Sequence, residues 1–111
     1  MKLSYIQLAG EKRPVCFSLS AIEEIMDEFG SLDKMKTELT GGNVRAINRV
    51  LEIMLDAGAA YCKGMGIDCP PKLQCRPGDL IGVGDTGVMT QIFEAIREDS
   101  ERSVETQQGK N

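Results

Sequence analysis

Cysteines are the most reactive side chains in this 111-residue chain: Cys16, Cys62, Cys69 and Cys75. No two of them form a C-x-x-C motif, and the sequence has no histidine that could complete a zinc site. A disulfide framework needs an oxidising compartment, which nothing else in the sequence indicates. We therefore expect reduced thiols, some of them buried as small apolar side chains, and no metal site.

Catalysis by a nucleophile or a general base has little support in the residue types. The absence of histidine removes the commonest general base and every triad that contains one. Cys16 has no candidate base to activate its thiol. Asp79 and Asp85 are the nearest approach to a carboxylate pair, and we interpret them as cap and turn residues. The sequence thus predicts no catalytic residue and no enzyme.

A glycine pattern resembles the fingerprint of a dinucleotide-binding fold. Gly82, Gly84 and Gly87 have the G-x-G-x-x-G spacing. That motif requires a buried strand before it and a βαβ unit around it. The preceding residues, PPKLQCRPGDLI, are not such a strand, and too few residues follow for the unit. We interpret the glycines as a connector with a helix start, and we expect no cofactor.

The charge and the hydropathy exclude two large classes of partner. The formal net charge is −4, from 13 basic and 17 acidic residues, which argues against a basic footprint for nucleic acid. Aromatic residues make up 5% of the chain and there is no Trp, so a base-stacking surface is not expected. No apolar run approaches the roughly 18 residues of a membrane helix, and the N-terminus lacks a signal-peptide pattern. We expect a cytoplasmic protein without membrane or nucleic-acid partners.

Four acidic residues gather on one predicted helix without any basic residue: Glu23, Glu24, Asp27 and Glu28. Acidic residues near the start of a helix stabilise it through the helix dipole. The alternative is that they form a surface for a basic protein partner. We take these four as candidate protein-binding residues, and both interpretations stay open.

The elements that position these residues follow from the apolar periodicity. Residues 2–8 and 14–19 alternate as strands, and the polar residues 9–13 between them predict a five-residue hairpin loop. Helices are then expected to start at a capping box on Ser20, at Ser31 and at Asn43, and Gly64 and Gly66 are expected to end the last of these. A final helix carries the apolar residues Val88, Met89, Ile92, Phe93 and Ile96.

These elements predict an α+β fold, with an N-terminal β-hairpin packed on a mostly helical body of three to four helices. Residues 1–97 form a single domain in this prediction, and the polar residues 98–111 form a flexible tail. Small residues on a flank of the third helix, with an edge strand of the hairpin, predict a close helix neighbour and self-association. The expected core residues are Val15, Phe17, Leu19, Ile22, Phe29, Ile47, Leu51 and Met54.

The order of motifs resembles a known family. A strand pair leads into FSLSAIEEIMDEFGSLDKM, then NVRAINRVLEIMLDAGAAYCKGMG, then CRPGDL and a last helix. Over about residues 3–97 this is similar to the tail assembly chaperones of long-tailed bacteriophages and prophages of Gram-positive hosts. The resemblance implies a non-enzymatic, multimerising cytoplasmic helper, absent from the finished virion, that keeps the tape measure protein soluble and brings tail tube subunits to it. Residues 82–87 depart from the family pattern, which leaves the start of the last helix open.

Two further hypotheses remain at this level. A small adaptor or regulatory module that binds one protein partner, with no viral role, is the alternative function, and a tape measure gene just downstream would decide between the two. In the family that the chain resembles, ribosomes often slip near the end of the short gene and make a longer product. Gly109, Lys110 and Asn111 can be encoded by a run of adenines that permits such slippage.

Overall fold

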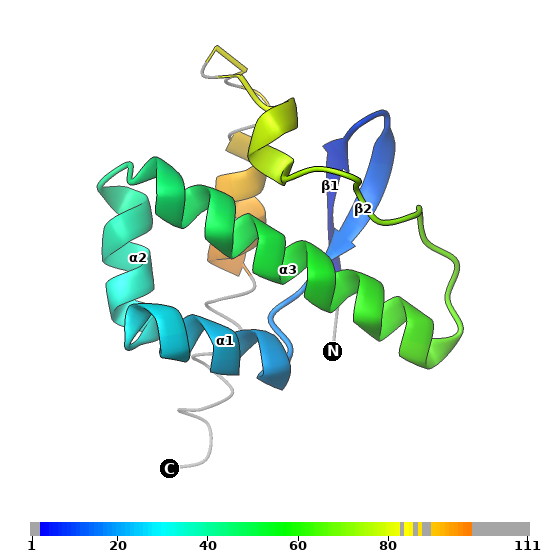
Figure 1. The fold of residues 1–111 in the computed structure, drawn as a ribbon, viewed down its shortest axis with the longest axis horizontal. Coiled ribbons are helices and arrows are strands. Elements are labelled where there is room, and N and C mark those ends of the chain that lie inside the picture. Colours follow the sequence, from blue (N-terminus) through cyan, green and yellow to red (C-terminus); the bar gives the residue numbers. More distant parts are fainter. Residues whose placement is uncertain (1–2, 83, 86, 88–89, 99–111) are drawn as a thin grey trace.

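The chain adopts an α+β fold in a computed structural model, which describes residues 3–82, 84–85, 87 and 90–98. An N-terminal hairpin precedes a helical body, as the sequence predicts (Figure 1). Of the expected tail, residue 98 is still helical, and residues 99–111, with the Gly109–Asn111 end, lie outside the described residues. The elements are β1 (Ser4–Leu8), β2 (Glu11–Val15), α1 (Leu19–Phe29), α2 (Leu32–Thr40), α3 (Val44–Met65), the 3₁₀ turn η1 (Pro77–Leu80) and a last helical segment over residues 90–98.

The hairpin turn is shorter than predicted. Strands β1 and β2 are antiparallel and are joined by only Ala9 and Gly10, whose φ angles are 54° and 77°. Positive φ at both central positions matches the twist of the flanking strands. The predicted five-residue loop is therefore wrong, and Glu11, Lys12 and Arg13 belong to β2. Polar residues can continue the ladder because two of these side chains are exposed and the third is hydrogen-bonded.

The start of α1 also differs from the prediction. Strand β2 ends at Val15 because its partner strand begins at Ser4, so residues 16–18 form an extended connector instead of a longer strand. Ser18, and not Ser20, is the N-cap: its Oγ accepts a hydrogen bond from the backbone N–H of Ala21 at 3.2 Å. Leu19 becomes the first helical residue and is 86% exposed, so its predicted place in the core is wrong.

The caps of the next two helices are as predicted. Ser31 Oγ and Asn43 Oδ1 each accept a hydrogen bond from the backbone N–H three residues later, at 3.1 Å in both cases. Of the two glycines expected to end α3, Gly64 lies within the helix and Gly66, whose φ is 70°, is its C-cap. A glycine within a helix is tolerated, whereas the αL cap forms where the chain reverses.

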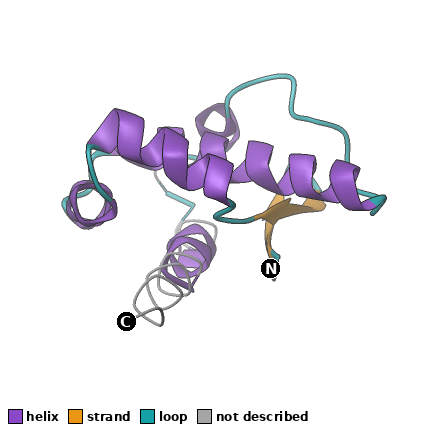
Figure 2. Cartoon of the chain, turned by 90° about the horizontal axis from the view of Figure 1, so that it is seen from below, coloured by secondary structure: helices purple, strands orange, loops and turns teal. Residues whose placement is uncertain are grey.

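Helix α3 is the centre of the fold. It runs across the molecule, with α1 and α2 along one part of it and the hairpin along the other (Figures 1 and 2). Val15, Phe17, Leu51 and Met54 are buried, as predicted, and Ile22, Phe29 and Ile47 are partly buried against them. The last helical segment completes the core with Ile92, Ala95 and Ile96.

The backbone of β2 lies directly against α3. A Cβ atom built on Gly58 would lie 2.0 Å from the carbonyl oxygen of Pro14 and 2.8 Å from the nitrogen of Val15. The backbone N–H of Cys16 donates to the carbonyl oxygen of Met54 at 3.4 Å. Any side chain at this point would force strand and helix apart, so glycine is favoured there.

The two surfaces expected to favour self-association are partly covered by the chain itself. On the small-residue flank of α3, Ala46 and Ile53 are buried, Ala57 is half-buried and Ala60 is exposed, with the start of α1 lying alongside. On β1, the backbone N–H of Gln7 donates to Oε1 of Gln91 in the last helical segment at 2.6 Å. None of the helices in the described part of the chain is long and apolar enough to span a membrane.

Candidate protein-binding surface

The four acidic candidates all lie exposed on α1, but the fold does not leave them equivalent. Arg49, which is 21 residues further along the chain on α3, donates from Nε to Oε1 of Glu28 at 2.6 Å. Its Nη1 also lies 3.8 Å from Oε1 of Glu52. Glu28 is thus paired within the molecule, and Glu23, Glu24 and Asp27 form the remaining negative surface of the helix.

The charge of Arg49 is secured by its surroundings. Burial lowers the pKa of its guanidinium, but the hydrogen bond that it donates to Glu28 and the charges of Glu28, Glu52 and Glu24 together raise the pKa above its ordinary value. Arg49 therefore stays protonated at every physiological pH. Because the side chains of Arg49 and Glu28 are more than one third exposed, solvent screens this ion pair and its contribution to stability is small.

Two large apolar side chains lie exposed on the same helix. Leu19 is 86% exposed and Met26 is 49% exposed. They are seven positions apart, which places them above one another on one side of a helix. Glu23 and Asp27 lie on the same side, four and eight positions after Leu19. We call these four residues the α1 outer face. It combines two apolar side chains with two carboxylates.

Sequence reasoning did not find the exposure of Leu19. It extended the alternating strand pattern to Leu19 and placed the cap two residues too late. The available signal was Ser18, which is as good an N-cap type as Ser20 and would have placed Leu19 in an exposed first turn. For Met26 the sequence offers only its residue type, which suits an adaptable surface.

The other candidate carboxylates close turns, as predicted. Asp79 Oδ2 accepts a hydrogen bond from the backbone N–H of Arg76 at 3.1 Å, within η1. Asp85 Oδ2 accepts one from the backbone N–H of Gly82 at 2.8 Å. The glycine pattern therefore begins with a closed turn. The predicted start of the last helix falls partly on residues 86, 88 and 89, which lie outside the described residues.

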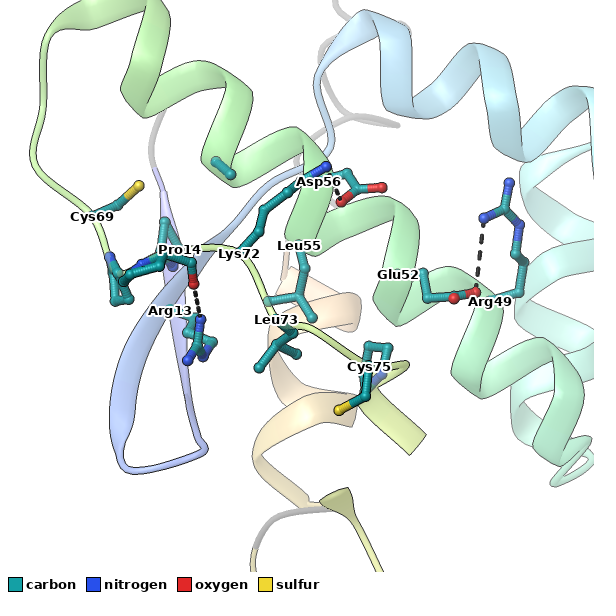
Figure 3. A pocket seen from close by; sticks show the side chains of 14 residues that line it. Arg13, Pro14, Arg49, Glu52, Leu55, Asp56, Cys69, Lys72, Leu73 and Cys75 are labelled. Carbon is teal, nitrogen blue, oxygen red and sulfur yellow. Dashed lines mark hydrogen bonds and ion pairs between the residues drawn. The ribbon is translucent and has the colours of Figure 1, made fainter. Parts of the chain in front are cut away.

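The four cysteines occupy two kinds of environment. Cys16 and Cys62 are buried, Cys69 and Cys75 are exposed, and none of the four is in a disulfide. Within the residues that the structure describes, no group of three His, Cys, Asp or Glu side chains could hold a metal ion. Cys69 and Cys75 line a cavity of about 170 Å³ between α3 and the segment of residues 66–76 (Figure 3).

Arg13 holds this segment against the hairpin. Its side chain is the buried charged group of the described core, and Nε donates to the carbonyl oxygen of Leu8 at 3.0 Å. Nη1 donates to the carbonyl oxygen of Pro71 at 2.7 Å (Figure 3). Further along, the backbone N–H of Gly78 donates to Oδ1 of Asn48 on α3 at 2.9 Å. The segment is therefore anchored near its middle and just after its end.

No protein-family model, no curated protein and no solved structure matches this chain. Function therefore has to be argued from the surfaces that the fold builds. On the α1 outer face, exposed apolar area and exposed carboxylates occur together, and both are features of a site that binds another protein.

Proposed function

We propose that this protein is a bacteriophage or prophage tail assembly chaperone: a non-enzymatic cytoplasmic protein that binds the tape measure protein and tail tube subunits. The observation that carries the proposal is the α1 outer face, with Leu19 and Met26 exposed beside Glu23 and Asp27. The order of motifs over about residues 3–97, which resembles that family, supports it. In this proposal the working form is a homo-oligomer.

The chemistry of the α1 outer face fits a transient holding function. Burial of an exposed Leu or Met side chain on a partner contributes about 1.5–3 kcal/mol each, which is enough for reversible binding of an exposed apolar segment. Glu23 and Asp27 favour segments that carry basic residues beside their apolar ones. The net charge of −4 favours the solubility of the protein and of a complex with an apolar segment.

The test is co-expression with the tape measure protein encoded just downstream, with the soluble yield of that protein as the measurement. The double variant Leu19→Gln with Met26→Gln removes the exposed apolar area and keeps good helix-forming residues. The matched control is Val44→Gln with Met65→Gln on α3, because Val44 is also a first helical residue and both side chains are exposed.

We expect the wild type and the α3 control to raise the soluble yield, and the α1 variant to lose the effect. If the wild type itself fails to raise it, the proposed function is wrong. If both variants retain it, the chaperone function stands and the α1 outer face is not the binding surface. The adaptor alternative predicts two different results. No tape measure gene lies beside the gene for this chain, and the protein still binds a basic amphipathic partner through α1.

A further inference from the structure

The chain reverses direction immediately after α3. Gly66 adopts the left-handed conformation, and its backbone N–H donates to the carbonyl oxygen of Lys63 at 3.4 Å. The backbone N–H of Ile67 donates to the carbonyl oxygen of Cys62 at 2.8 Å. This pair of bonds is typical of a helix that ends in an αL residue. The residues after Gly66 are therefore led back alongside the last turn of α3.

This reversal brings two thiols together. The side chains of Cys62 and Cys69 are hydrogen-bonded to each other. Cys62 is 1% exposed on the buried face of α3, whereas Cys69 is exposed in the segment of residues 66–76. Figure 3 shows Cys69 on that segment beside α3, well separated from Cys75. One thiol of the pair is thus open to solvent and the other is held behind it.

We propose that Cys62 and Cys69 are a redox pair that closes to an intramolecular disulfide when the protein meets a peroxide. In the first step the exposed Cys69 sulfur attacks one oxygen of hydrogen peroxide. The S–O bond forms, the O–O bond breaks, and the thiol proton leaves with the second oxygen as water, which gives a sulfenic acid. In the second step the Cys62 sulfur attacks the Cys69 sulfur. The S–S bond forms, the S–O bond breaks, and the hydroxyl leaves with the Cys62 proton as a second water.

The order of the two steps follows from the environments of the two thiols. Burial raises the pKa of the Cys62 thiol, and the charge and hydrogen bond of Cys69 raise it further, so Cys62 is protonated at neutral pH. A protonated, buried thiol reacts poorly with dissolved peroxide, whereas an exposed one is accessible. Cys62 then acts as the resolving thiol because it already contacts the sulfur that has been oxidised.

The surrounding segment can accommodate the closure. A disulfide needs the two sulfur atoms to approach from hydrogen-bond contact to about 2.05 Å. Residues 66–69 are all exposed, and no atom lies within 4 Å of a Cβ built on Gly66. The segment's anchor at Pro71 lies beyond Cys69, so the residues before it can shift without breaking the bond to Arg13. The disulfide would hold the segment to α3 at its start as well.

The test uses the reduced, full-length protein treated with one equivalent of hydrogen peroxide, followed by alkylation and mass spectrometry. Tryptic cleavage after Lys63 and Lys72 places Cys62, Cys69 and Cys75 in three different peptides. We expect two of the four thiols to escape alkylation and a cross-link between peptides 50–63 and 64–72. Addition of dithiothreitol should restore all four alkylations.

Serine variants assign the pair. Cys69→Ser, at an exposed position that leaves the core intact, should abolish the cross-link, and Cys62→Ser should do the same. Cys75→Ser is the matched exposed control and should retain the cross-link at the wild-type level. The proposal is wrong if Cys69 is found joined to Cys75, if the main product is a disulfide-linked dimer, or if Cys69 is oxidised to sulfinic acid while Cys62 stays fully alkylated.

Discussion

Replacement of Gly58 by alanine tests the central contact of the fold, where the backbone of β2 lies on α3. The added methyl group would lie 2.0 Å from the carbonyl oxygen of Pro14 and 2.4 Å from its carbonyl carbon. Ordinary contacts of a carbon atom begin near 3.5 Å, so strand and helix must move apart by about 1 Å or more. The obstructing atoms are backbone atoms of a paired strand and cannot rotate away as a side chain would.

Two opposing effects set the magnitude. Alanine is favoured over glycine within a helix by about 1 kcal/mol. Overpacking of a well-packed core costs about 1–3 kcal/mol and occasionally more, and here the displaced strand also carries Val15, which is fully buried. Because the whole backbone must shift, we expect the upper part of that range and a net loss of about 2 kcal/mol. For a domain of this size that lowers Tm by about 8–16 °C.

Gly64→Ala on the same helix is the matched control. No atom lies within 4 Å of a Cβ at Gly64, and its φ is not positive, so the substitution should leave Tm unchanged or raise it by a few degrees. Thermal unfolding followed by circular dichroism measures Tm for both variants. If Gly58→Ala is as stable as the wild type while Gly64→Ala behaves as expected, β2 does not lie on α3 at Gly58.

Three further outcomes follow from buried groups. Leu51→Ala should lower the free energy of unfolding by about 2–5 kcal/mol, measured by urea titration, because Leu51 is 2% exposed within the hydrophobic core. Arg13→Gln removes the charged donor to the carbonyl oxygen of Pro71, so limited trypsin cleavage after Lys72 should accelerate about tenfold or more, and an unchanged rate would refute the anchoring role. The pKa of the Cys62 thiol is raised in the folded protein, so as the pH rises the thiol loses its proton in the unfolded chain before it does so in the folded one. The contribution of Cys62 to stability is therefore complete at neutral pH and declines above about pH 9. Cys62→Ala should flatten that decline when Tm is measured against pH.

Local interactions made much of the fold predictable. The α+β class follows from the change of apolar period between the hairpin and the helices. Ser31 and Asn43 were identified as caps because each bonds to a residue only three positions away. The long apolar stripe that includes Leu51 and Met54 likewise identified α3 without knowledge of its neighbours.

Errors arose where two local solutions were equally good. Ser18 and Ser20 are both suitable caps, and the choice depends on where β1 stops pairing with β2. Because the pairing of β1 with β2 stops at Val15, Leu19 is the first residue of α1 and is exposed. The end of α3 is predicted at Gly64 and Gly66 together, and only the structure shows that the cap is Gly66, where the chain reverses.

The sequence by itself determined helices α2 and α3, the α+β class and the excess of acidic residues on α1. Only the tertiary structure decided that Arg49 pairs with Glu28, that Gly58 admits the backbone of Pro14, and that Cys69 reaches Cys62. The physical reason is range. Caps and periodicity act within one or two turns of chain, whereas these three contacts depend on how a strand, a helix and a connecting segment pack together, for which no local pattern provides a signal.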